Sequence, residues 1–246
     1  MTPSEILKIP SMPIWGSSYP KGPYRFVNRE YFVITYETDP DVLRRAVPEP
    51  LEPESNLVSY EFMNMPDSSG FGDYTESGLV IPCLFKGEKV NFTLQMYLDD
   101  EPPITAGREI WGFPKKWGHP KLEVVKDTLT GTLHYAGQLV AMGSMGFKHE
   151  VITPDVVKDK IGKKQMVLKL IPNVDGTPAI AQLTTFSMTD IVVKGGWSGP
   201  ARLHLIPHAG APVADFPVRR IVSGAHLLAD MTLPYGTVAH DYLKEK

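Results

Sequence analysis

The sequence predicts a mainly β fold with a few short helices, in which an antiparallel sheet closes into a barrel or a cone. Most of the hydrophobic pattern has a period of two, which is typical of half-buried strands. Proline occurs 23 times in 246 residues, about twice its usual frequency, and it disfavours long helices. The candidate strands are short and fairly regularly spaced, as expected for a sheet that folds over on itself.

The clearest strand is predicted at residues 89–98. Its alternation places Val90, Phe92, Leu94, Met96 and Leu98 on one face. Further strands are predicted at residues 31–36, 58–65, 128–134, 138–145, 165–171, 181–193, 201–206 and 221–233.

Two short helices are predicted, each opened by a capping residue and a proline. Asp39 and Pro40 begin the first, which ends before Pro48, and residues 153–162 form the second, with Val156, Val157 and Ile161 on its apolar side. We expect residues 1–246 to form a single domain. Residues 1–20 are expected to form an irregular arm, and the last few residues are expected to fray.

Composition argues against several classes of protein. The net charge of −3, with acids and bases interspersed, gives no basic stripe for nucleic acid. The sequence contains no run of about 18 apolar residues, so no membrane span is predicted. The N-terminus does not resemble a secretory signal. Cys83 is the only cysteine, which excludes an intramolecular disulfide and suggests a reducing compartment. The expected location is therefore the cytoplasm.

Motifs for metals and cofactors are weak or missing. His204 and His208 have a ligand-like spacing, but Pro207 between them breaks the helix that would align them. No glycine-rich dinucleotide or phosphate loop and no GxSxG sequence is present. We expect neither a metal nor a cofactor, which leaves amines and carboxylates to carry any chemistry.

The segment FPKKWGHPK is the most informative stretch of the sequence. Lys115 and Lys116 lie between Phe113 and Trp117, and Trp111 lies just upstream. An adjacent pair of lysines is usually a solvated surface feature. An aromatic, proline-stiffened setting can instead desolvate one amine enough to lower its pKa and make it a nucleophile.

Three polar residues in aromatic or turn-rich segments are further candidates: Arg29, Glu61 and Glu76. Each also has an ordinary interpretation. Arg29 is typical of a surface ion pair, and Glu76 is expected in a glycine-bounded loop, where an exposed acid is common. Glu61 belongs to a predicted strand whose two faces are both mixed, so the pattern does not tell which face is interior.

Nearly the whole chain, from about residue 20 to residue 243, resembles the acetoacetate decarboxylase family. The resemblance is carried, in order, by PKGPYRFVNREYF, AVPEPLEPE, GDYTESG, QMYLDDEP, GREIWGFPKKWGHPKL, LIPNVDGTP, GPARLHL and LADMTLP. It implies decarboxylation of a small 3-oxo acid, acetoacetate, to acetone and CO2 without a cofactor. It also implies a β-rich cone or barrel assembled into large homo-oligomers.

The resemblance assigns roles to individual residues. Lys115 matches the lysine that forms a Schiff base with the substrate, and Lys116 matches its neighbour. Arg29, Glu61 and Glu76 match polar residues of the family's pocket; we expect Glu76 to participate more directly and Glu61 to support it. Phe113 departs from the family pattern, which has a tyrosine there, so a hydroxyl at this position is not essential if the enzyme is active.

The chemistry requires an unprotonated amine. A lysine with an ordinary pKa of about 10.4 is almost fully charged near neutral pH, and burial can lower that pKa by about 3–5 units. Adjacent side chains point to opposite faces of a strand, so Lys116 is poorly placed to help Lys115. We therefore predict that apolar surroundings dominate the pKa of Lys115 and that Lys116 orients or anchors the segment.

Two other functions are compatible with these residues. A lysine imine also activates aldol condensation or dehydration of a different oxo acid. A β-barrel that binds a small apolar ligand without catalysis, with Lys115 as a carboxylate anchor, is the other alternative.

Overall fold

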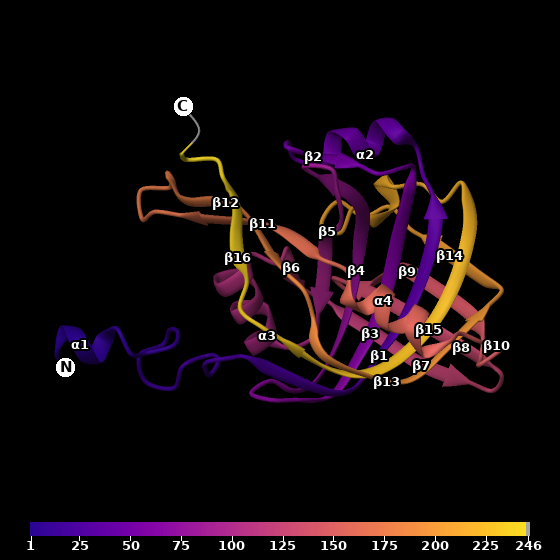
Figure 1. Cartoon of the computed structure of the whole chain (residues 1–246), viewed down its shortest axis with the longest axis horizontal. Helices are drawn as coiled ribbons and strands as arrows, with labels where there is room; N and C mark the ends of the chain where they lie inside the picture. Colours follow the sequence, from indigo (N-terminus) through magenta and orange to yellow (C-terminus); the bar gives the residue numbers. More distant parts are fainter. Residues whose placement is uncertain (245–246) are drawn as a thin grey trace.

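The computed structural model describes residues 1–244 and contains two β-sheets with short helices around them (Figure 1). The larger sheet has twelve strands: β1 (Tyr24–Glu37), β2 (Leu51–Pro53), β3 (Leu57–Ser68), β4 (Gly72–Phe85), β5 (Glu88–Leu98), β6 (Lys115–Trp117), β10 (Glu150–Val151), β11 (Gln165–Pro172), β12 (Pro178–Phe186), β13 (Thr189–Gly199), β15 (Arg220–Leu233) and β16 (Thr237–Asp241). The smaller sheet has four: β7 (His119–Val125), β8 (Thr128–Tyr135), β9 (Gln138–Gly146) and β14 (Ala201–Leu205). The mainly β prediction is confirmed.

The large sheet is open. Its strand order is β10-β13-β15-β1-β3-β4-β5-β11-β12-β16, and within residues 1–244 the two end strands do not pair with each other. The predicted closure into a barrel or cone is therefore not confirmed. Beyond β5 the ladder divides into two short parallel pairings, with β6 at one end of β5 and β11 at the other, so the sheet is not purely antiparallel either.

The small sheet packs on one face of the large sheet and forms the main core. Phe32, Ile34 and Phe62 of the large sheet belong to the same buried cluster as Leu129 and Leu133 of β8. Two glycines of the small sheet allow this close approach: a Cβ atom at Gly131 would lie 2.3 Å from the Phe62 ring, and one at Gly143 would lie 2.7 Å from Ile34. The opposite face of the large sheet remains available for a cavity.

The helices are short. They are α1 (Pro3–Ile6), α2 (Pro40–Ala46), α3 (Glu101–Ala106) and α4 (Pro154–Gly162), with a π-helix η1 (Gly107–Trp111) and a 3₁₀ helix η2 (Val213–Asp215). The predicted extents of α2 and α4 are confirmed, but neither Asp39 nor Thr153 caps its helix through a side-chain hydrogen bond. Val156 of α4 is exposed, while Val157 and Ile161 are buried. None of the helices in residues 1–244 combines the length and apolar character needed to cross a membrane.

Several strand predictions require correction. The strand predicted at residues 181–193 is two strands, β12 and β13, which are separated at Ser187 and Met188. The single apolar face predicted for residues 89–98 is also wrong. A register shift in the pairing with β4 leaves Leu94 without a partner, so Phe92 packs in the main core while Met96 turns to the other face of the sheet.

The N-terminal arm lies apart from the sheets (Figure 1). It contains α1, whose N-terminus has a capping box formed by Thr2 and Glu5, so the arm is not wholly irregular. The Tyr19 hydroxyl donates a hydrogen bond to Glu109 at 2.5 Å and ties the end of the arm to η1. Fraying was predicted for residues 241–246. Asp241 instead belongs to β16, and the Tyr242 amide donates a hydrogen bond to the Ala181 carbonyl at 3.0 Å; residues 245–246 lie outside the described residues.

Candidate active site

A cavity of about 580 Å³ lies on the face of the large sheet opposite the main core. It is lined by residues of β1, β3, β4, β5, β11, β12, β15 and the α4 region, together with the segment that leads into β6. Five of the six predicted site residues line it: Arg29, Glu61, Glu76, Phe113 and Lys115. The sixth, Lys116, is not among the lining residues.

The local fold around Lys115 places its side chain in the cavity. The π-helix η1 ends at Gly112, whose positive φ of 94° turns the chain toward β6. β6 then pairs in parallel with β5, so that Lys115 lies opposite Met96. The Arg108 guanidinium donates a hydrogen bond to the Lys115 carbonyl at 3.1 Å and fixes this short strand to η1.

Gly107 packs directly on the Lys115 side chain. A Cβ atom at this position would lie 2.6 Å from Cδ and 2.8 Å from Cε of Lys115. The backbone of η1 therefore forms one wall of the channel that holds the lysine side chain, and a glycine is needed there.

Replacing Gly107 by alanine is expected to displace the Lys115 amine. Because misplacing a reacting group by about 1 Å can cost on the order of 100-fold in rate, we expect kcat to fall roughly 10- to 100-fold with a smaller change in KM. For the decarboxylation that the family resemblance implies, steady-state kinetics of CO2 release would measure this effect. Gly146→Ala is the control, because Gly146 has no positive φ and the nearest atom to its Cβ position lies 3.6 Å away, an ordinary van der Waals contact. An unchanged kcat in the Gly107 variant would contradict the prediction.

The Lys115 amine is buried among aromatic and charged groups. The residue is 7% exposed, and its Nζ donates a hydrogen bond to Glu76 Oε1 at 2.7 Å and lies 5.1 Å from the Phe113 ring centre. Burial lowers the pKa of Lys115; Glu76 opposes this effect, and the charge of Arg29 adds to it. This ranking agrees with the prediction that desolvation dominates.

Lys116 points away from the cavity. Its ammonium group donates a hydrogen bond to the Gly210 carbonyl and lies 4.9 Å from the ring centre of Tyr135. The adjacent lysines thus lie on opposite faces of β6, as predicted from strand geometry. The cation that acts on Lys115 across the cavity is Arg29, not Lys116.

Arg29 reaches the cavity through an irregularity in β1. The pairing with β15 shifts between Phe26 and Arg29, and Asn28 has a positive φ of 56°. This β-bulge lets Phe26 and Arg29 line the same cavity although three positions separate them. The guanidinium lies 3.7 Å from Glu76 and 4.7 Å from the ring centre of Tyr31. It is buried, unlike the surface residue that the ordinary interpretation expected.

Glu76 lies at the centre of this charged group. The sequence predicted a loop, but Glu76 belongs to β4 and is 2% exposed. Its two carboxylate oxygens face different cations, Oε1 facing Lys115 and Oε2 facing Arg29. The carboxylate of Glu76 can be buried because Arg29 of β1 and Lys115 of β6 supply compensating positive charges.

Glu61 lies further along the cavity on β3. It shares the cavity-facing side of that strand with Ser59 and Met63, while Tyr60 and Phe62 point into the main core. Neither side faces bulk solvent, which explains why the sequence pattern was ambiguous. Burial raises the pKa of Glu61 to about 7, and Glu76 adds to this effect while Arg29 opposes it.

Several contributors were not predicted from the sequence. Gly107 and Arg108 lie in the segment GREIWGFPKKWGHPKL, which contributes to the family resemblance but gave no separate signal for these two residues. Tyr31 and Tyr74 line the cavity, and burial raises the pKa of both phenols, so they stay protonated near neutral pH. Within residues 1–244, no cluster of three or more histidine, cysteine, aspartate or glutamate side chains is suited to hold a metal ion.

Comparison with known proteins places the chain in a family. The family profile described as acetoacetate decarboxylase (ADC) matches residues 9–243. The chain belongs to the acetoacetate decarboxylase family. A relative from Acidiphilium cryptum, named acetoacetate decarboxylase, is 56% identical over 233 residues, which are 95% of each chain. The acetoacetate decarboxylase of Burkholderia mallei is 52% identical over the full length of both chains.

Solved structures of acetoacetate decarboxylases share the fold. The crystal structure of the enzyme from Legionella pneumophila is 51% identical and superposes with a TM-score of 0.93, covering 97% of this chain and 96% of that one. A second acetoacetate decarboxylase structure is 50% identical and has a TM-score of 0.97 over 99% of this chain and all of that one. The two-sheet architecture of this chain is therefore shared with solved structures of the family.

Proposed function

We propose that the protein decarboxylates acetoacetate to acetone and CO2 through a Schiff base on Lys115. The observation that carries the proposal is a buried lysine whose pKa is lowered by desolvation, in a cavity of a chain more than 50% identical to named acetoacetate decarboxylases. The enzyme is thus a carbon–carbon lyase. Its own lysine supplies the electron sink.

The reaction proceeds in three steps. The neutral Lys115 amine adds to the ketone carbon, and loss of water gives a protonated imine. The bond from the α-carbon to the carboxylate then breaks, and its electron pair moves toward the iminium nitrogen, which leaves an enamine and releases CO2. Protonation of the α-carbon and addition of water release acetone and restore the amine.

Glu76 is placed to handle the proton of Lys115. Its Oε1 accepts the Lys115 hydrogen bond at 2.7 Å, so it can take a proton from the ammonium and return it during imine formation. Because Oε2 faces Arg29, the carboxylate is held in one orientation while it does so. Glu76 is therefore the second catalytic residue.

Arg29 and Glu61 act on the substrate carboxylate. Arg29 attracts and orients this group, whose charge disappears as CO2 leaves. Glu61, with a pKa of about 7, is neutral at slightly acidic pH and can donate a hydrogen bond instead of repelling the anion. Phe113 contributes an apolar wall, and Lys116 anchors the strand through Gly210.

Borohydride trapping tests the proposal. Incubation with acetoacetate and borohydride is expected to inactivate the protein and to leave a reduced adduct on the peptide that contains Lys115, while acetone and CO2 form without borohydride. An adduct without CO2 would instead indicate an aldolase or dehydratase acting on another oxo acid. No adduct and no CO2 would indicate a protein that only binds a ligand.

The remaining proposals concern the organisation of the chain. We infer that residues 1–246 form one domain, since the large sheet takes strands from β1 to β16. Assembly into a large homo-oligomer is supported by the exposed apolar side chains of the arm, including Leu7 and Trp15. A cytoplasmic location is supported by the lone, buried thiol of Cys83. Light scattering of the purified protein would test the assembly.

A further inference from the structure

We propose that Lys160 and Lys163 form a carboxylate-binding site in the outer part of the cavity, separate from the position where Lys115 reacts. The outer part is defined here by Thr35, Ser59, Thr93 and these two lysines, all of which line the cavity. The inference rests on the proposed function, because the ligand is a 3-oxo acid on its way to Lys115 or already attached to it.

The strand register separates the two parts of the cavity. Met63 of β3 pairs with Glu76, and Ser59, four residues away on the same strand, pairs with Val80. Four residues of an extended strand cover roughly 13 Å. Acetoacetate has only four carbons, so a molecule bound to Lys115 beside Glu76 cannot at the same time reach the row that contains Ser59.

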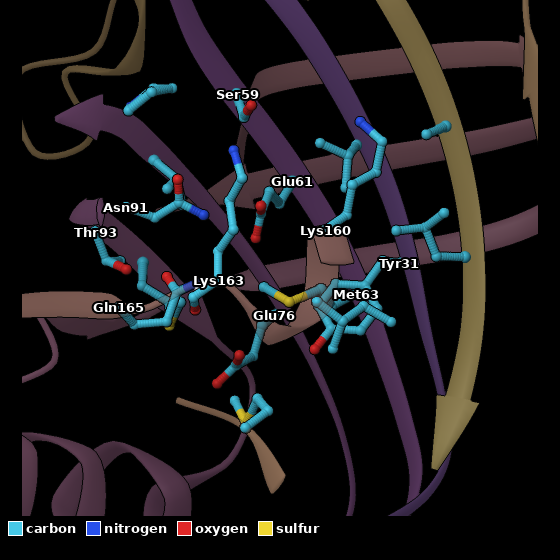
Figure 2. Close-up of a pocket in the computed structure, with 18 of the residues that line it drawn as sticks. Tyr31, Ser59, Glu61, Met63, Glu76, Asn91, Thr93, Lys160, Lys163 and Gln165 are labelled. Atoms are coloured by element: carbon cyan, nitrogen blue, oxygen red, sulfur yellow. Dashed lines mark hydrogen bonds between the residues drawn. The ribbon is translucent and has the colours of Figure 1, made fainter. Parts of the chain in front are cut away.

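The two lysines bring positive charge to this outer part. Lys160 lies in the last turn of α4, and Lys163 follows the helix directly. In Figure 2 the Lys163 ammonium lies on the Ser59 side of Glu61, while Glu76 lies on the other side. Within residues 1–244 neither ammonium group has a hydrogen bond or an ion pair, whereas the neighbouring Lys164 is paired with Glu88.

The acids that line the cavity do not cancel this charge. Glu54 lines the outer part but forms an ion pair with Lys89. Glu61 is the other acid on this path, and its raised pKa keeps it largely neutral below about pH 7. Neutral donors complete the site, because the hydroxyls of Thr35 and Ser59 lie 3.3 Å apart at its wall. A carboxylate is the ligand that such a set of ammonium and hydroxyl groups recognises.

Two sources could supply that carboxylate. One is the single carboxylate of acetoacetate, captured while the substrate passes toward Lys115. The other is the distal carboxylate of a longer 3-oxo diacid, which would stay on the lysines while its 1-carboxylate leaves as CO2. The cavity volume of about 580 Å³ is in the range that holds drug-sized ligands, so the cavity is larger than acetoacetate alone requires.

The experiment compares three substrates in five proteins. CO2 release from acetoacetate, 3-oxodecanoate and 3-oxodecanedioate is measured over a range of salt concentrations for the wild type, Lys160→Gln, Lys163→Gln and the double variant. The ten-carbon diacid is chosen because its distal carboxylate is far enough from the ketone to reach the outer part of the cavity. Lys158→Gln is the matched control, because Lys158 is exposed on the same helix but does not line the cavity. All these lysines are exposed, so the variants should fold.

Each outcome bears on the proposal. Capture in transit predicts that the double variant loses about tenfold in kcat/KM for all three acids, with little change in kcat and a weaker salt dependence. Binding of a distal carboxylate predicts that this loss is confined to the diacid. The proposal is overturned if the double variant matches the wild type for every acid, or if Lys158→Gln has the same effect.

A binding measurement separates this inference from the proposed function. Glutarate carries two carboxylates but no ketone, so it cannot form an imine. Calorimetric titration should show binding to the wild type that weakens about tenfold in the double variant but not in Lys158→Gln. If the wild type releases no CO2 from acetoacetate, the proposed function fails, and this titration still decides whether the outer site exists.

Discussion

Replacing Lys115 by glutamine is expected to lower the rate of CO2 release from acetoacetate by on the order of 10⁴-fold or more. Glutamine has a similar length but no nucleophilic amine, so the imine cannot form and only binding in the cavity remains. Glutamine keeps an N–H donor for Glu76 Oε1, the hydrogen-bond partner of the buried amine, so the fold should be retained and the loss should appear in kcat. Initial rates, with circular dichroism to check the fold, would measure it.

The matched control is the same substitution at the next residue. Lys116→Gln should retain activity within about threefold, because the Lys116 ammonium lies outside the cavity, donates a hydrogen bond to the Gly210 carbonyl and is not among the groups that shift the pKa of Lys115. The pKa of Lys115, measured from the acid limb of kcat/KM, should also stay low. A return of that pKa toward about 10.4 would show that the neighbouring charge, and not burial, controls the nucleophile.

The regular part of the fold could be predicted from the sequence because local alternation and turn residues specify it. The strands predicted at residues 128–134 and 138–145 are β8 and β9, which form a hairpin with its turn at Ala136 and Gly137. Departures from alternation could not be predicted. The bulges at Asn28 and Leu94 depend on how β1 and β5 pair with other strands, and these bulges decide that Arg29 and Met96 face the cavity.

The candidate site shows a similar division. Considered singly, Arg29 and Glu76 were more typical of exposed residues and the face of Glu61 was ambiguous, so the family resemblance alone brought the three together. The structure gives the physical reason: Glu76 is buried because β1 and β6 bring Arg29 and Lys115 to its two oxygens. A compensated charge of this kind is a property of three distant segments, so no local pattern reveals it.

The alkaline limb of the pH profile is expected to belong to Glu61. Its pKa is raised to about 7, so the side chain is neutral below that pH and negative above it. The substrate carboxylate is ionised throughout this range. Above pH 7, kcat/KM should therefore fall about tenfold per pH unit as Glu61 becomes charged and repels the substrate.

The fall should have a limit set by the repulsion between the two charges. At an effective dielectric constant of about 20, two like charges ~5 Å apart repel by roughly 3 kcal/mol, which corresponds to about two orders of magnitude in kcat/KM. Bound substrate also favours the neutral form of Glu61. The corresponding limb of kcat should consequently lie at a higher pH than that of kcat/KM.

Glu61→Gln should remove the alkaline limb while leaving the acid limb of Lys115 in place. Glutamine keeps the shape and hydrogen-bonding ability of the neutral acid but cannot become charged. Glu54→Gln is the control, because Glu54 also lines the cavity but forms an ion pair with Lys89, and its limb should match that of the wild type. If the limb near pH 7 persisted in Glu61→Gln, another group would have to titrate there. Glu76, whose two carboxylate oxygens lie beside Lys115 and Arg29, would then be the next residue to test.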